Sequence, residues 1–91
     1  MSALYQLYIE ITRIADKIVV VWYGQELDGE KLRTLRRTRN LSQLELAVQA
    51  GTTQATISEL ERNRRRVQYR TARRLAAALG VGPEELLKHR A

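Results

Sequence analysis

Arginine is the side chain that this sequence supplies in excess. The 91 residues hold 16 Lys and Arg against 10 Asp and Glu, a formal net charge of +6, and the run Arg62–Arg74 contains seven arginines and no acid. A guanidinium is a planar fork of donors that fits the oxygens of a phosphate. On a helix, Arg70 and Arg74 would repel each other unless an anion lay nearby. The excess therefore predicts a polyanionic partner.

Residue types for covalent catalysis or metal binding are nearly absent. The chain has no cysteine, and its one histidine is His89, close to the C-terminus. This excludes disulfides, thiolate nucleophiles and Cys-ligated zinc, and it argues against a Ser-His-Asp triad or a clustered His site. The sequence also lacks a paired-carboxylate motif and a Gly-rich phosphate loop. We expect a protein that is not an enzyme and has no metal or cofactor.

Length and composition predict a small soluble protein. Apolar residues make up 44% of the 91, enough for one core and too many for a disordered tail. The longest apolar run, Ile18–Tyr23, is far shorter than the ~20 residues that span a membrane. The N-terminus lacks the basic and then apolar pattern of a signal peptide. We expect a cytoplasmic protein with no membrane partner.

Charge divides the chain into two regions. Residues 1–28 carry two basic and four acidic side chains, a balance of −2, whereas residues 29–91 carry fourteen and six, a balance of +8. We therefore predict an N-terminal extension over residues 1–27 and a separate domain over residues 28–91, each with its own task.

Helix signals follow one another closely in the second region. Asp28 is the predicted N-cap of a helix that ends near Asn40. Ser42 and Glu45 form a capping box, in which each side chain satisfies the backbone N–H of the other. Gly51 is the predicted left-handed residue that ends this second helix.

Three further helices are expected after that turn. Thr53 is the predicted N-cap of a helix over 53–63. A fourth helix covers about 68–79 and ends at Gly80, and the fifth begins at Pro83, whose ring is suited to a first helical turn. The sequence therefore predicts a mainly α fold with five short helices.

The second and third helices form a pair with a specific use. Residues 42–50 and 53–63 are joined by a tight turn at Gly51, which is the geometry of a helix-turn-helix. The turn fixes the angle between the helices, so one crosses the sugar-phosphate backbone while the other enters the major groove. The groove helix needs small or polar residues at its exposed start, and Gln54 and Ala55 are of this kind. The pair predicts DNA binding.

Two stretches carry a family resemblance: Leu41-Ser-Gln-Leu-Glu-Leu-Ala-Val-Gln-Ala-Gly-Thr-Thr-Gln-Ala-Thr-Ile-Ser-Glu-Leu-Glu61 and Ala76-Ala-Ala-Leu-Gly-Val81. They resemble the Cro/CI family of phage repressors, also called the XRE family. The resemblance covers about residues 28–88. It implies a five-helix, lambda-repressor-like helix-turn-helix domain that binds double-stranded DNA and regulates transcription. A repressor that binds a palindromic operator as a homodimer is the form that it favours.

The resemblance also implies roles for individual residues. Gln54 leads the base-reading set because an amide both donates to and accepts from adenine in the major groove. The implied base-reading residues are Gln54, Ala55, Thr56 and Glu59. Gln43 is implied to contact phosphate and to brace Gln54. The other implied phosphate contacts are Thr53, Arg62, Asn63, Arg64, Arg65 and Arg66.

Other positions are implied to be structural, or depart from the family. Arg36 and Glu61 resemble an internal ion pair that joins the first and third helices, so Arg36 is left out of the DNA-contacting set. Asn63 stands where members frequently have glycine, and asparagine tolerates the left-handed conformation that the turn needs. Leu44 and Val48 stand where charged residues are common, and this apolar pair suggests that something covers it.

The extension over residues 1–27 lies outside the resemblance and is compatible with two structures. Residues 5–11 alternate between apolar and polar, and Ile18–Tyr23 is a run of strand formers, so a β-hairpin is favoured. The alternative is a dimerising helix with an apolar heptad at Leu4, Leu7, Ile11, Ile14, Ile18 and Val21. The predicted task is dimerisation or docking, with a cap on the chain's own core as the competing interpretation. The predicted interaction surface comprises Leu44, Val48, Ile18, Val20 and Trp22.

Three functional alternatives accompany the regulator. An antitoxin would bind a toxin through residues 1–27 and repress its own operon. A restriction-modification controller would be a variant of the regulator. A general coactivator would bind DNA weakly and without sequence preference.

Overall fold

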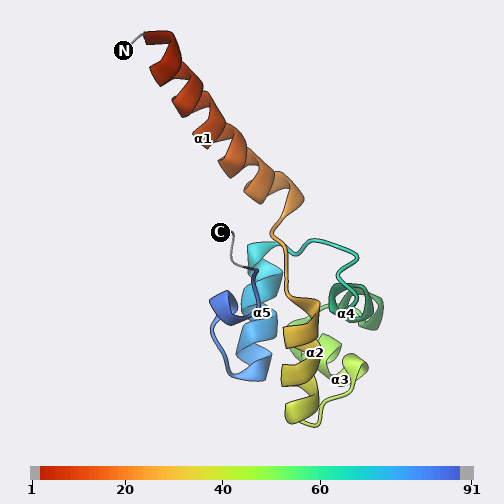
Figure 1. Cartoon of the computed structure of the whole chain (residues 1–91). Coiled ribbons are helices and arrows are strands. Elements are labelled where there is room, and N and C mark those ends of the chain that lie inside the picture. Colours follow the sequence, from red (N-terminus) through yellow and green to blue (C-terminus); the bar gives the residue numbers. More distant parts are fainter. Residues whose placement is uncertain (1–2, 89–91) are drawn as a thin grey trace.

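The computed structural model describes residues 3–88, and the side chains of residues 16–23 are outside the description. It contains α1 (Ala3–Tyr23), α2 (Gly29–Thr38), α3 (Gln43–Ala50), α4 (Gln54–Glu61), α5 (Tyr69–Leu79) and a 3₁₀ turn, η1 (Pro83–Glu85). Figure 1 shows α1 projecting from a bundle formed by the other helices. The radius of gyration is 16.2 Å, against about 12 Å for a compact chain of this length.

The bundle surrounds one apolar core. Its largest fully buried side chains come from every helix of the bundle and from the residue after η1: Leu32, Leu46, Ile57, Leu60, Leu75, Leu79 and Leu86. Small residues of α3 and α5, among them Ala47, Ala72 and Ala76, let these helices approach closely. This core fixes α4 against α3, which is the arrangement that the helix-turn-helix pair requires.

The predicted helix boundaries in the bundle are confirmed closely. Asp28 accepts a hydrogen bond from the backbone N–H of Lys31, and Ser42 and Glu45 form the capping box. Gly51 and Gly80 end α3 and α5 in the left-handed conformation, at φ values of 68° and 72°. The mainly α, lambda-repressor-like fold is confirmed, with the fifth predicted helix reduced to the single 3₁₀ turn η1.

The β-hairpin favoured for the N-terminal extension is wrong, because residues 3–23 form the single helix α1. The heptad of apolar residues runs through this whole segment, whereas the strand-like alternation covers only its first half. The proposed turn around Asp16 contains no glycine, proline or asparagine to reverse the chain. The β-branched residues lower helix propensity by only tenths of a kcal/mol each, about 0.7 at most.

The segment after α1 belongs structurally to the bundle. Gln25 and Val67 exchange two backbone hydrogen bonds, of 2.8 and 2.9 Å. Leu27 faces Leu87 in a second antiparallel bridge, whose hydrogen bonds run from Asp28 N–H to the Leu86 carbonyl and from Lys88 N–H to the Glu26 carbonyl, and the Leu27 side chain lies in the core. Beyond these two bridges, the described residues form no β-structure.

Candidate nucleic-acid interface

The start of α4 presents a small, polar outer surface. Ile57 and Leu60 face the core, so Gln54, Ala55 and Glu59 are exposed on the other side of the helix. The structure therefore places the implied base-reading residues on one outward surface, with Thr56 half-buried beside them. The Gln54 amide has no hydrogen-bond partner among the described residues and is available to a ligand.

Thr53 and Thr56 organise the first turn of α4. The Thr53 hydroxyl accepts a hydrogen bond from the backbone N–H of Thr56 at 3.2 Å, and the two hydroxyls lie 3.0 Å apart. Thr53 is thus the N-cap, and the unpaired backbone N–H groups and the helix dipole make this end favourable to an anion.

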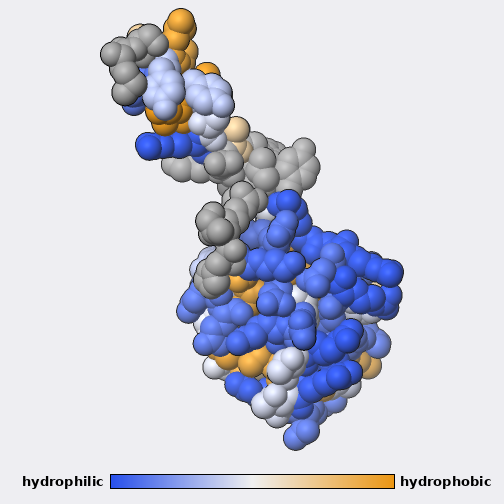
Figure 2. Space-filling view, viewed as in Figure 1, coloured by the Kyte–Doolittle hydropathy of each residue, from blue (hydrophilic) through white to orange (hydrophobic). Residues whose placement is uncertain are grey.

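The loop after α4 carries four exposed arginines, and three of them are positioned by side chains or backbone nearby. Arg62 donates to the Ser58 hydroxyl one turn back on α4. Arg65 bonds to Thr56 and pairs with Glu59 at 3.2 Å, across the exposed surface of α4. The basic side chains lie beside the predicted base-reading residues, and Figure 2 shows the strongly hydrophilic surface of the bundle.

Arg66 points to the segment that follows α1. Its guanidinium donates to the carbonyl of Gly24 at 3.4 Å and lies 3.7 Å from the Glu26 carboxylate. Arg64 is exposed and has no partner among the described side chains, so it is the arginine of this loop that is most available to a phosphate.

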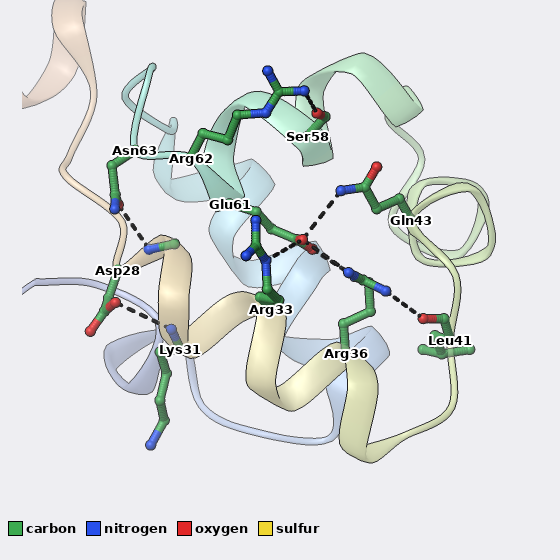
Figure 3. Close-up of polar contacts among 11 residues, drawn as sticks. Asp28, Lys31, Arg33, Arg36, Leu41, Gln43, Ser58, Glu61, Arg62 and Asn63 are labelled. Atoms are coloured by element: carbon green, nitrogen blue, oxygen red, sulfur yellow. Dashed lines mark hydrogen bonds and ion pairs between the residues drawn. The ribbon is translucent and has the colours of Figure 1, made fainter.

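Glu61 is the centre of a buried polar cluster beneath α4 (Figure 3). Its carboxylate side chain is 0% exposed and accepts hydrogen bonds from Arg36 at 2.6 and 3.0 Å. Arg33 adds a third contact at 3.4 Å, and Arg36 also donates to the carbonyl of Leu41 at 2.9 Å. The structure therefore brings together Arg36 and Glu61, from α2 and α4, as an internal ion pair.

The same cluster sets the ionisation state of Glu61. Burial raises the pKa of this carboxyl, but the hydrogen bonds from Arg36 and Gln43 and the charge of Arg36 outweigh burial and lower it overall. The pKa of Arg36 is raised, mainly by its hydrogen bond to Glu61. Both groups therefore stay charged at neutral pH.

Gln43, expected to contact phosphate and brace Gln54, is hydrogen-bonded to the buried cluster. The Gln43 amide donates to the Glu61 carboxylate at 3.2 Å, so this side chain ties α3 to the buried cluster. The contact joins residues 18 positions apart, and no local pattern in the sequence indicates it.

Asn63, just after α4, links the end of that helix to the start of α2. It adopts the expected left-handed conformation, at φ 56°, and its side-chain oxygen accepts a hydrogen bond from the backbone N–H of Gly29 at 2.9 Å. A Cβ on Gly29 would lie 2.3 Å from the carbonyl oxygen of Leu60, so only glycine lets α2 start this close to α4. The sequence offered no signal for this contact.

The predicted apolar interaction surface is only partly described. Leu44 and Val48 are 56% and 71% exposed, so no described part of the chain covers them. The competing interpretation of residues 1–27 as a cap on the chain's own core stays a prediction. The side chains of Ile18, Val20 and Trp22 lie outside the described residues.

Neither a metal centre nor a membrane-spanning helix is found among the described residues. Between residues 3 and 88, no three His, Cys, Asp or Glu side chains gather as a metal centre would require. No helix in the described part of the chain has the length and apolar character needed to cross a membrane.

Comparison with known proteins agrees with this geometry. A family model described as helix-turn-helix matches residues 32–86. The HTH-type transcriptional regulator RghRB of Bacillus subtilis is 43% identical over 60 residues, which are 65% of this chain and 43% of RghRB. The chain thus spans less than half the length of this relative.

Two solved structures share the fold. The restriction-modification controller protein C.AhdI from Aeromonas hydrophila matches with a TM-score of 0.61 at 37% identity, over 63% of this chain and 86% of the controller. The P22 c2 repressor, solved in complex with a synthetic operator, matches with a TM-score of 0.64 at 30% identity, over 66% of this chain and 91% of the repressor. Because the family model matches more than half of its residues, this chain belongs to the helix-turn-helix family of the Cro/CI type, a family of DNA-binding transcriptional regulators.

Proposed function

We propose that this protein is a sequence-specific regulator that reads double-stranded DNA with α4, acts in the cytoplasm, and binds without catalysis. The observation that carries the proposal is the outward surface of α4, where Gln54 is exposed and unpartnered beside the exposed arginines of the following loop. A rigid helix that offers an amide to the major groove while arginines hold the phosphates satisfies the two requirements of specific recognition.

Within this proposal the residues divide into three groups. Gln54, Ala55, Thr56 and Glu59 contact base edges. The backbone of the DNA is held by Thr53 and by the loop arginines Arg62, Arg64, Arg65 and Arg66. Asn63 and Gln43, the other two expected phosphate contacts, also support this surface through their contacts with Gly29 and Glu61.

The single experiment that tests the proposal is selection of bound duplexes from a random library, carried out with the full chain at two salt concentrations. An enriched palindromic motif is the expected result, since helix-turn-helix dimers bind half-sites about one helical turn, ~34 Å, apart. A library that shows no enrichment at either salt concentration would contradict sequence-specific reading and would favour a coactivator-like role.

Two substitutions then separate base reading from phosphate binding. Gln54→Ala is expected to cost about 1–3 kcal/mol on the selected duplex and little on random DNA. Arg64→Ala is expected to weaken both alike and to reduce the salt slope by about 0.9. Gln49→Ala, the same change at an exposed position of α3, is the control and should leave both affinities unchanged.

A restriction-modification controller is the second candidate, because C.AhdI, a protein of that description, is 37% identical to this chain. A reporter placed behind the selected operator distinguishes activation from repression, and neighbouring methylase and nuclease genes would favour the controller. For the antitoxin alternative, neither RghRB nor C.AhdI is described as an antitoxin.

A further inference from the structure

The exposed apolar side chains of α1 form a stripe along one side of the helix. Leu4, Leu7, Ile11 and Ile14 are each more than half exposed. They recur at alternating spacings of three and four residues, which is the a/d pattern of a coiled coil. Figure 2 shows apolar surface on the projecting helix, in contrast to the hydrophilic face of the bundle.

Helix α1 is poorly suited to exist alone. Of its 21 residues, 12 are β-branched or aromatic, types that lose side-chain freedom in a helix. An isolated helix of this length is marginal in water even for alanine-rich sequences, and most helical stability in proteins comes from packing of an apolar face. A helical α1 therefore implies a surface that buries its apolar stripe.

We propose that α1 packs against α1 of a second copy of this chain, antiparallel, as a short coiled coil. This inference rests on the proposed function, since it names the contact by which the regulator becomes a dimer on DNA. The apolar stripe is the same on both copies, so a two-fold axis across the middle of α1 makes it self-complementary.

The register follows from the heptad. In this register, each residue faces the residue of the second copy whose number brings the sum to 25. Ile11 therefore packs against Ile14 of the second copy at the centre, and the two-fold axis makes this contact occur twice. Leu7 then meets position 18 and Leu4 meets position 21, which are isoleucine and valine in the sequence. This gives six a/d positions per helix over three heptads, the lower limit for a coiled coil, so we expect a weak dimer.

Charge favours the antiparallel orientation over the parallel one. In this register Glu10 lies within about 3 Å, along the helix axis, of position 17 of the second copy, a lysine in the sequence. Both are g positions, which face each other only in the antiparallel pair. Residues 24–91 hold fourteen basic and eight acidic side chains, so each bundle is positive. A parallel pair would hold the two bundles at one end, where they repel.

The length of α1 agrees with the spacing that DNA imposes. In the antiparallel pair, the two copies of residue 23 are about 32 Å apart along the axis. This is close to the ~34 Å between half-sites on one face of DNA. A parallel pair would start both bundles about 10 Å apart, although the chain is 20 Å across in its two shorter dimensions.

The junction between α1 and the bundle can transmit this spacing to α4. Gly24 has φ +79°, and a Cβ there would lie 2.6 Å from the carbonyl oxygen of Val67. Gln25 is hydrogen-bonded in both directions to Val67, next to Arg66, which itself bonds to Gly24. The exit of α1 is therefore fixed to the loop that follows α4.

Sedimentation equilibrium of the full chain without DNA tests the pairing. Self-association is expected in the range of about 1–300 µM, and Ile11→Gln combined with Ile14→Gln should weaken it at least about 100-fold. Thr12→Gln combined with Arg13→Gln, at positions outside the a/d stripe, is the matched control and should change it less than about threefold. A chain that stays monomeric throughout, or two pairs of variants that behave alike, would overturn the proposal.

A single spin label tests the orientation, because the natural sequence has no cysteine. Labels on Ala3→Cys, an exposed position outside the a/d stripe, are expected about 29 Å apart along the axis in an antiparallel dimer, against about 10 Å in a parallel one. The short distance would refute the antiparallel register. Neither measurement contains DNA, so failure of the pairing would leave the reading of DNA by α4 to be judged by its own binding experiments.

Discussion

The bundle and α1 place the same residue type in opposite surroundings. Leu32, Leu46 and Leu75 of the bundle are completely buried, whereas Leu4 and Leu7 of α1 are 77% and 51% exposed. Burial of one such side chain stabilises a fold by roughly 1.5–3 kcal/mol, and an exposed one contributes nothing of this kind. The bundle therefore buries the side chains that stabilise it, whereas the apolar side chains of α1 add no such burial within the described part of the chain.

The helix ends differ in the same way. Each of α2, α3 and α4 has a side-chain N-cap hydrogen bond, supplied by Asp28, Ser42 and Thr53. Helix α1 has no acidic residue in its first turn and no basic residue in its last turn. Capping side chains thus specify each of these three bundle helices locally. The contrast with α1 teaches that an apolar heptad repeat can specify a helix without such caps, provided that the apolar face is buried.

Truncating the buried carboxylate is expected to have the largest effect on the bundle. Glu61→Ala leaves the Arg36 guanidinium, whose side chain is only 11% exposed, without its charge partner. Loss of one partner of a buried pair costs about 3–5 kcal/mol. Urea unfolding, followed by circular dichroism, measures the change.

Glu59→Ala is the control for that substitution, because the Glu59–Arg65 pair is about half exposed on both sides. Exposed pairs contribute about 0–1 kcal/mol. Equal losses from the two substitutions would show that the cluster around Glu61 does not support the bundle.

Acid should weaken the same cluster by a smaller amount. The folded state lowers the pKa of Glu61, so its stabilising contribution is complete above the ordinary value near 4.3 and is lost as pH falls through the folded pKa. The free energy of unfolding should therefore fall below about pH 5. Glu61→Gln should remove part of this dependence. The capping-box carboxylate Glu45, whose pKa is also lowered by hydrogen bonds from Ser42, accounts for part of the remainder.

Removing the N-cap of α3 should lower the free energy of unfolding by less than the loss of Glu61 does. Ser42→Ala deletes the hydroxyl that accepts from the backbone N–H of Glu45 at 3.0 Å. The expected loss is about 1 kcal/mol, measured by the same urea titration. Ser58→Ala, in the interior of α4, should stay within about 0.5 kcal/mol of the parent, and a loss as large as that of Ser42→Ala would argue against the cap.

Prediction from sequence succeeded where structure is decided locally. The capping box at Ser42 and the left-handed glycines Gly51 and Gly80 act within one helical turn, so the sequence displays them directly. The pair of Arg36 and Glu61 spans 25 positions, and only the family resemblance suggested it. The contacts of Gln43 with Glu61 and of Asn63 with Gly29 were missed because they depend on how folded helices meet.

The N-terminal segment shows the other limit of local reasoning. Residues 5–11 satisfy both a strand alternation and part of a heptad, and their β-branched residues favour a strand. Secondary structure here depends on which face is buried, and among the described residues no part of the bundle buries the apolar side chains Leu4, Leu7, Ile11 and Ile14. Because no packing contact decided between the two patterns, the β-branched residues favoured the hairpin. Helix α1 stands apart from the bundle in Figure 1 for the same reason, since it has no packing contact there.

The smallest expected effect tests the comparison most directly, because one change is made in both regions. Leu75→Ala removes a fully buried side chain of α5 and should cost about 2–5 kcal/mol. Leu7→Ala makes the same truncation on α1, and for the chain diluted below its self-association range the free energy of unfolding should change by less than about 0.5 kcal/mol. At concentrations where α1 pairs, the Leu7→Ala loss should grow with protein concentration, since association adds to the apparent stability of the folded state. A large loss for Leu7→Ala at high dilution would mean that α1 packs on its own bundle, and the distinction between the two regions would fail.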